Sequence, residues 1–165
     1  MGNIGQPLPF SKHTSLPWYY RLYFFGLHGF FDEIVFTSLH DFIFEDRDIR
    51  LRGHSSLYSF LIYGLGSLQC EYIYFRYLKN RVGLLGRSFF YVFFGFSWEF
   101  FTGLLLSSIS ACPWDYSHKP YNVMGLITLD YAPLWIMAGW MQEAISDFLS
   151  KVRICNDDTK EKEDS

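Results

Sequence analysis

Three long stretches of this sequence carry almost no formal charge, and they constrain its fold more than any other feature. Residues 88–114 contain one charged residue, Glu99, and residues 120–142 contain only Asp130. Residues 53–70 contain no Asp, Glu, Lys or Arg. A helix of about 20 mostly apolar residues can cross a bilayer, whereas a surface helix of a soluble protein has polar residues on one side. The stretches lack that periodicity and therefore predict a membrane protein.

The composition favours the same class. Of the 165 residues, 50% are hydrophobic and 21% are aromatic, so a densely packed soluble helical protein is the disfavoured alternative. The length allows one domain or one small helix bundle. The net charge of −3 gives no sign of the basic face that nucleic-acid binding requires. The three cysteines fall in different regions and cannot form a disulfide framework.

We predict an all-α fold, a polytopic membrane bundle of four transmembrane helices. The charged and Pro-rich flanks predict an irregular N-terminal tail and a disordered C-terminal tail. The membrane domain covers residues 18–150 between tails 1–17 and 151–165, and its spans cover about 22–42, 57–77, 88–110 and 123–148. Pro133 is expected to interrupt the fourth span.

Lysine and arginine are distributed unevenly between the two sides of this topology. Ten of them fall on the side of both termini and four on the other side, which favours cytoplasmic termini. The segment "ACPWDYSHKPYN" (residues 111–122) is then the outer connection between spans three and four.

Ionisable residues at membrane depth are the most informative feature for function. A charged side chain at the bilayer centre costs about 2.5–3.5 kcal/mol, so three unpaired ionised acids cost on the order of 8–10 kcal/mol. That sum is comparable to the stability of a typical domain. The main candidates for a proton, cation or solute site are His28, Glu33, Glu99 and Asp130, and the secondary candidates are Asp32 and Glu71.

No lysine or arginine is expected at the depth of these acids. Arg21, Arg76 and Arg87 lie near the inner ends of their spans, and His28 is the only deep basic group. The acids are therefore expected to be protonated, hydrogen-bonded across helices, or bound to a cation. Two interpretations remain open: the acids bond structurally to other helices, or they line a path for protons, ions or a solute. A helix broken by Pro133 beside Asp130 would favour the second.

The other polar groups give weaker predictions of function. His28 and Asp32 are spaced i, i+4 and can form a local pair, but two groups are too few for a usual metal site. Cys112, Asp115 and His118 admit a zinc site or a thiol nucleophile with a base, as in an enzyme acting on lipids. We favour instead a structural cap with interfacial aromatic anchors. The predicted cap comprises Cys112, Pro113, Trp114, Asp115 and Tyr116.

Several segments resemble the transmembrane protein 229 family, within a wider group of ABC-transporter permeases of CmpB type. They are "ACPWDYS", "MGLITLDYA", "WEFFTG", "LHGFFDEIVFT" and "FLIYGLGSLQCEYIY", and the resemblance covers about residues 18–148. It implies a small multi-pass membrane protein without an established chemistry. Asp32, beside Glu33, departs from the neutral residue expected there. The chain has no phosphate-cradling Gly-rich motif with a lysine, so any ATP hydrolysis would belong to another subunit.

These observations predict a non-enzymatic multi-pass membrane protein with no cofactor and no metal site. It is either a transport component whose acids bind protons or cations, or a membrane scaffold or adaptor whose acids are structural. Four spans are few for a permease. The expected partners are therefore the lipid bilayer and a second copy of the chain or another membrane subunit, and nucleic acid is not among them.

Overall fold

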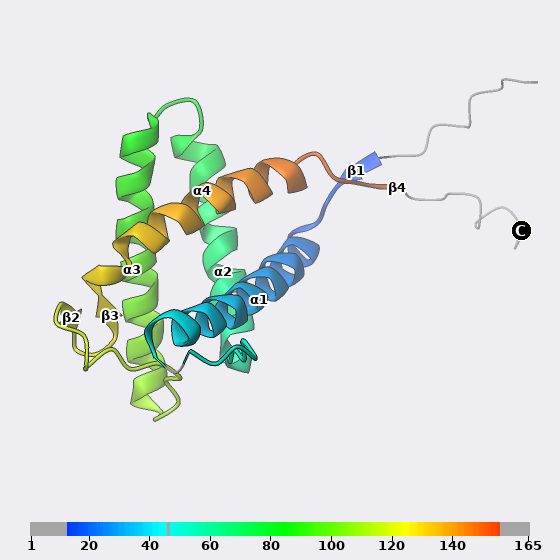
Figure 1. The fold of residues 1–165 in the computed structure, drawn as a ribbon. Helices are drawn as coiled ribbons and strands as arrows, with labels where there is room; N and C mark the ends of the chain where they lie inside the picture. The colour runs from blue at the N-terminus through cyan, green and yellow to red at the C-terminus, as the bar shows by residue number, and fades with distance from the viewer. Residues whose placement is uncertain (1–12, 46, 156–165) are drawn as a thin grey trace, which may run out of the picture.

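The computed structural model describes residues 13–45 and 47–155, and most of them are helical (Figure 1). This confirms the predicted all-α class. The main helices are α1 (Trp18–Phe44), α2 (Leu57–Ile73), α3 (Leu84–Ser108) and α4 (Ala132–Leu149). Among the described residues, one helix, α3, is long and apolar enough to cross a membrane. α2 has only 17 residues and continues into a short π-helix, η1 (Tyr74–Leu78).

The helices form two pairs by their contacts: α1 packs against α2, and α3 packs against α4. The pairs contact each other chiefly through α2 and α4. In Figure 1, α1 and α4 run obliquely across the more upright α2 and α3. Glycines allow the close approach within each pair, because a ring can lie directly against backbone that has no Cβ. Gly29 of α1 faces the Tyr63 ring of α2, and Gly139 of α4 faces the Tyr91 ring of α3.

The end of α3 is specified locally. Ser110 adopts a left-handed backbone with φ of 55°, and the Ala111 N–H donates a 2.8 Å hydrogen bond to the Leu106 carbonyl. The Ser110 N–H donates to the Ser107 carbonyl at 3.0 Å. This is the Schellman arrangement, which satisfies carbonyl groups left open at a helix end.

The predicted fourth span is wrong at its start. The chain first forms a hairpin of β2 (Asn122–Val123) and β3 (Ile127–Thr128), then a 3-10 turn, η2 (Leu129–Tyr131), before α4 begins. Pro133 lies in the first turn of α4 and does not interrupt it. The missing N–H of proline is harmless there, because first-turn N–H groups have no partner within the helix.

Part of each predicted tail is ordered, which corrects the irregular assignment for the residues concerned. β1 (His13–Ser15) pairs antiparallel with β4 (Arg153–Cys155). The two segments meet because the start of α1 lies beside the end of α4, where Arg21 Nη2 donates to the Leu149 carbonyl at 3.4 Å. The rest of the predicted tails, residues 1–12 and 156–165, lies outside the described residues.

Candidate functional site

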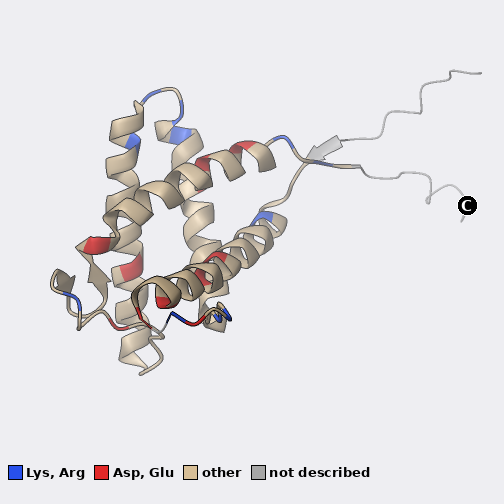
Figure 2. Ribbon diagram, viewed as in Figure 1, with Lys and Arg blue, Asp and Glu red and all other residues tan. Residues whose placement is uncertain are grey.

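A cavity of about 960 Å³ lies between the two helix pairs. All four helices contribute to its wall, together with loop residues 113–116. The structure brings four of the predicted site residues to this wall: His28, Asp32, Glu33 and Glu99. Asp130 and Glu71 do not line it. Figure 2 shows acidic positions within α1 and α3, far from the basic turn that joins α2 to α3.

Glu99, in the middle of α3, is held by the loop that follows this helix. The Tyr116 hydroxyl donates a 2.9 Å hydrogen bond to Glu99 Oε1. The other oxygen, Oε2, is buried and has no hydrogen-bond partner among the described residues. The Trp135 indole of α4 lies beside this carboxyl group. Glu99 therefore lines the cavity with one carboxylate oxygen that is enclosed by neighbouring side chains and has no hydrogen-bond donor among the described residues.

Glu33 and Asp32, on α1, each have a different partner. Ser55 Oγ, in the segment between α1 and α2, donates to Glu33 Oε2 at 3.0 Å. That segment folds back along α1, where Thr37 Oγ1 bonds to both the N–H and the carbonyl of His54. His28 Nδ1 lies 2.6 Å from Asp32 Oδ2, which confirms the predicted local pair.

Asp130 does not join the other acids. It lies in η2, its side chain is exposed, and it accepts a 3.3 Å bond from Thr128 Oγ1. The prediction that Asp130 belongs to an intramembrane site beneath the loop is therefore wrong. It depended on a fourth helix beginning near residue 123, and the hairpin that replaces this helical start carries Asp130 to the surface.

Glu71 has the cationic partner that sequence reasoning did not find. Arg21 Nη1 lies 2.5 Å from Glu71 Oε1, and the Glu71 side chain is only 8% exposed. Arg21 also donates to the Leu16 carbonyl at 3.2 Å. Glu71 is thus a member of a structural ion pair between α1 and α2 and lies outside the cavity.

Two further ion pairs lie at the same end of the molecule, which we call the basic end: the η1–α3 turn, the start of α1 and the end of α4 (Figure 2). Arg87 Nε donates to Glu143 Oε1 at 2.7 Å, and the Tyr91 hydroxyl donates to the same oxygen at 2.6 Å. Lys79 pairs with Asp147. The acids of the basic end are therefore paired with arginine or lysine, whereas no arginine or lysine is among the described residues of the cavity wall.

The loop after α3 packs on this helix through Trp114 and Tyr116. The Trp114 indole donates to the Leu126 carbonyl at 3.0 Å and packs against Gly103 of α3. Cys112 Sγ contacts the Trp114 carbonyl at 3.4 Å. Cys112, Asp115 and His118 do not form a metal-ligand group in the described part of the chain. Whether the loop has any role beyond these contacts stays a prediction.

Two loop side chains have shifted pKa values. The Ser117 backbone N–H and hydroxyl both donate to the Asp115 carboxylate, and these bonds lower the pKa of Asp115. Burial, and then the nearby negative charge of Glu99, raises the pKa of the Tyr116 hydroxyl well above its usual range. Tyr116 therefore remains a protonated donor toward Glu99 at any physiological pH.

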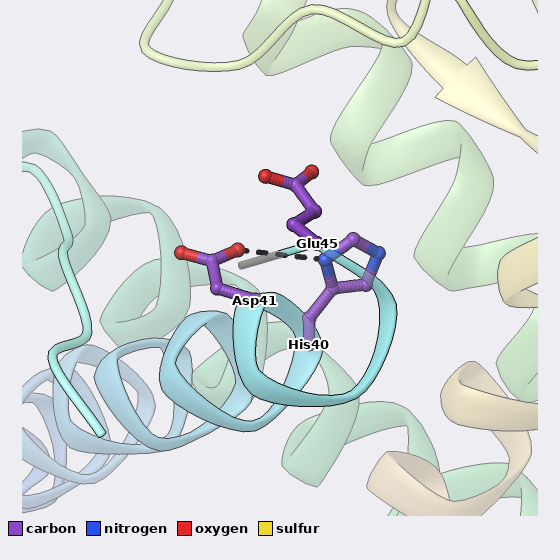
Figure 3. Close-up of side chains that lie close together, drawn as sticks. All are labelled: His40, Asp41 and Glu45. Carbon is purple, nitrogen blue, oxygen red and sulfur yellow. Dashed lines mark ion pairs between the residues drawn. The ribbon is translucent and has the colours of Figure 1, made fainter. Parts of the chain in front are cut away.

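One group of side chains could hold a metal ion, although the sequence analysis did not single it out. His40, Asp41 and Glu45 lie at the end of α1, and their ligand atoms are within 4.8 Å of one another (Figure 3). His40 Nδ1 and Asp41 Oδ1 are 3.5 Å apart. Imidazole and carboxylate groups are ligands that suit zinc and similar ions. The group lines the cavity but contains neither Glu33 nor Glu99.

Comparison with known proteins agrees with the wider of the two resemblances. A family model described as "Putative ABC-transporter type IV", of CmpB type, matches residues 18–158. No solved structure matches the chain. The narrower likeness to the transmembrane protein 229 family stays a prediction. Because the match includes all four helices and the loop that holds Glu99, the chain belongs to the CmpB-type ABC-transporter family and is a protein of the membrane.

Proposed function

We propose that this chain is a multi-pass component of a membrane transport system, and that its cavity binds protons or cations. Glu99 and Glu33 are the principal groups, with Asp32 and His28 beside them. The free and buried Oε2 of Glu99 carries the proposal, since a structural carboxylate would be expected to have all its buried oxygens bonded. Intramembrane ionisable residues commonly mark ion and substrate pathways.

The proposal includes four spans with both termini in the cytoplasm. The imbalance of lysine and arginine supports this orientation. It assigns the basic end, with the Arg21–Glu71 and Arg87–Glu143 pairs, to the cytoplasmic side. The cavity, which reaches the loops at residues 54–56 and 113–116, then faces the outer side.

A transporting form would require a second copy or another subunit. Four helices are few for a permease, and an ATP-driven system would need an ATPase on another chain. The family to which the chain belongs supports such an assembly.

The test compares Glu99→Gln with Glu143→Gln in mild detergent and in proteoliposomes. Glu99→Gln keeps the acceptor for Tyr116 and removes a costly charge, so it should unfold at the same temperature as wild type or higher. Glu143→Gln weakens the bond to Arg87 and should lower the unfolding temperature by several degrees. Wild-type proteoliposomes should dissipate an imposed pH or sodium gradient at least tenfold faster than Glu99→Gln. Equal flux in the two proteins would reject the proposal.

The second candidate function is a membrane scaffold or adaptor whose acids bond structurally between segments. The Tyr116–Glu99 and Ser55–Glu33 hydrogen bonds favour it. This function predicts that Glu99→Gln and Glu33→Gln both unfold several degrees below wild type and that neither changes ion flux.

A further inference from the structure

We infer that the cavity is built for an organic cation, an ammonium group attached to an apolar or aromatic body. The inference rests on the proposed function and narrows its ligand class from protons or cations in general. Three properties of the cavity carry it: its volume, its charge and its aromatic lining.

The volume exceeds what a proton or a bare ion requires. At about 960 Å³, the cavity is at the upper end of the roughly 300–1,000 Å³ typical of sites for drug-sized ligands. A metal ion needs several ligand atoms around one point, at roughly 2–2.6 Å from the ion. The metal-ligand group found in the described part of the chain is His40–Asp41–Glu45, and Glu33 and Glu99 are not part of it.

The charge of the wall selects a cation. Asp32, Glu33 and Glu99 all line the cavity, and no lysine or arginine is among the described residues of its wall. Arg21 and Arg87, at the basic end, have acidic partners of their own. Lys119 is not part of the wall and lies over the Tyr131 ring, with Nζ 5.9 Å from its centroid. An anionic ligand would therefore meet Glu33 and Glu99, which have no cationic partner among the described residues, whereas a cation would supply the missing charge.

Aromatic rings line the part of the cavity wall next to the loop that holds Glu99. Tyr116, which bonds to Glu99, is in edge-to-face contact with Tyr131, with ring centroids 5.3 Å apart and planes at 88°. Phe36 contacts the same Tyr131 ring at 5.6 Å and 86°. Trp135 completes this wall near the carboxyl group. Ring faces attract ammonium groups, as the approach of Lys119 Nζ to 5.9 Å from the Tyr131 centroid illustrates, and the carboxyl group of Glu99 lies beside these rings. The combination fits a protonated amine that carries an apolar group.

The experiment uses a matched pair of probes on the purified full-length protein in lipid nanodiscs. Naphthylmethylamine is a cation at neutral pH, and naphthylmethanol is its uncharged counterpart of nearly the same shape. Binding is measured by isothermal titration calorimetry on wild type, Glu99→Gln and Asp130→Asn, with Asp130 as an exposed acid outside the cavity. We expect saturable binding of the amine and at least tenfold weaker binding of the alcohol. Glu99→Gln should weaken amine binding at least tenfold, and Asp130→Asn should leave it unchanged.

Equal affinities for the amine and the alcohol, or equal amine affinities for wild type and Glu99→Gln, would overturn the inference. A thermal unfolding curve of Glu99→Gln establishes that the variant is folded, and Glu99→Asp, which restores the charge, should recover part of the affinity. Flux measurements separate this inference from the proposed function. If protons or sodium cross in a Glu99-dependent way but the amine does not bind, the inference about an organic cation is rejected and the proposed function is kept. Amine binding without any flux would retain the binding site and reject transport by this chain alone.

Discussion

The hydroxyl group of Tyr116 donates a 2.9 Å hydrogen bond to Glu99, and so connects the loop after α3 to the middle of that helix. The bond joins the two features that stood out in the sequence: the polar segment 111–122 and the single acid in the apolar stretch before it. Tyr116 bonds to one oxygen of Glu99, and the other oxygen is buried without a hydrogen-bond partner among the described residues.

Replacing Tyr116 with phenylalanine should destabilise the protein. The change leaves Glu99 without its donor, and an unsatisfied buried carboxylate costs about 1–3 kcal/mol. Thermal unfolding in detergent should show a fall of several degrees. The control is Tyr121→Phe in the same loop. The Tyr121 side chain is 63% exposed, so this change should alter the free energy of unfolding by less than about 0.5 kcal/mol. Equal unfolding temperatures of the two variants would contradict the importance of the bond.

The Arg21–Glu71 pair should show strong coupling in a double-mutant cycle. Arg21→Met or Glu71→Gln alone leaves the partner without its counterpart in a buried position, which costs about 3–5 kcal/mol. The double variant should be less destabilised than the sum of the two singles, as chemical denaturation would measure. The Asp48–Arg50 pair is the exposed comparison, and its removal should change stability by about 0–1 kcal/mol. Additive effects of Arg21 and Glu71 would mean that the pair does not form.

Gly139→Ala should loosen the packing of α4 on α3. The new methyl group would meet the Tyr91 ring, which is only 2% exposed and cannot move freely. Such overpacking costs about 1–3 kcal/mol. Gly83→Ala is the control, because a Cβ at Gly83 would have no neighbour within 4 Å. The expected readout is a lower unfolding temperature for Gly139→Ala, while Gly83→Ala remains close to wild type.

Asp115 should make stability depend on pH in the acid range. Its pKa is lowered in the folded protein, so its contribution is fully present above the unfolded value of about 3.9 and is lost as pH falls through the lower folded value. Asp115→Asn keeps an acceptor oxygen but does not titrate. The difference in unfolding temperature between wild type and Asp115→Asn should therefore shrink as the pH falls below about 4. A difference that stays constant over that range would show that the Ser117 bonds do not depend on the charge.

Several acids of the cavity wall could be predicted from the sequence, but most of their hydrogen-bond partners could not. Apolar length alone located the segments around Glu99 and Glu33, and the i, i+4 spacing of His28 and Asp32 predicted their pair. The hydrogen-bond partners of the other acids were missed because they are distant in the sequence. Ser55 is 22 residues from Glu33, and Arg21 is 50 residues from Glu71. One sequence feature could have indicated the Arg21–Glu71 pair. Arg21 lies at the start of the first predicted span and Glu71 lies toward the end of the second, so both are near the same side of the membrane.

For Asp130 and Pro133 the prediction from the sequence was wrong, because a proline at this position has two possible structural meanings. Proline is compatible with a kink inside a helix and with the first turn of a new one, and only the hairpin before α4 distinguishes the two. Met124 and Gly125, with φ of 56° and 70°, form the turn of that hairpin. Their left-handed backbone ends any helical continuation from residue 123.

The sequence by itself determined the all-α class, the approximate positions of the helices and the presence of acids in apolar segments. These features depend on residues that are close in the chain, through periodicity, turn chemistry and the cost of burying charge. Only the tertiary structure decided which acids are paired and which face a cavity. Glu71 is paired because α1 brings Arg21 beside it, whereas Glu99 keeps a free oxygen because the loop supplies it with one hydroxyl group. Such pairing depends on how distant segments pack, which no local pattern specifies.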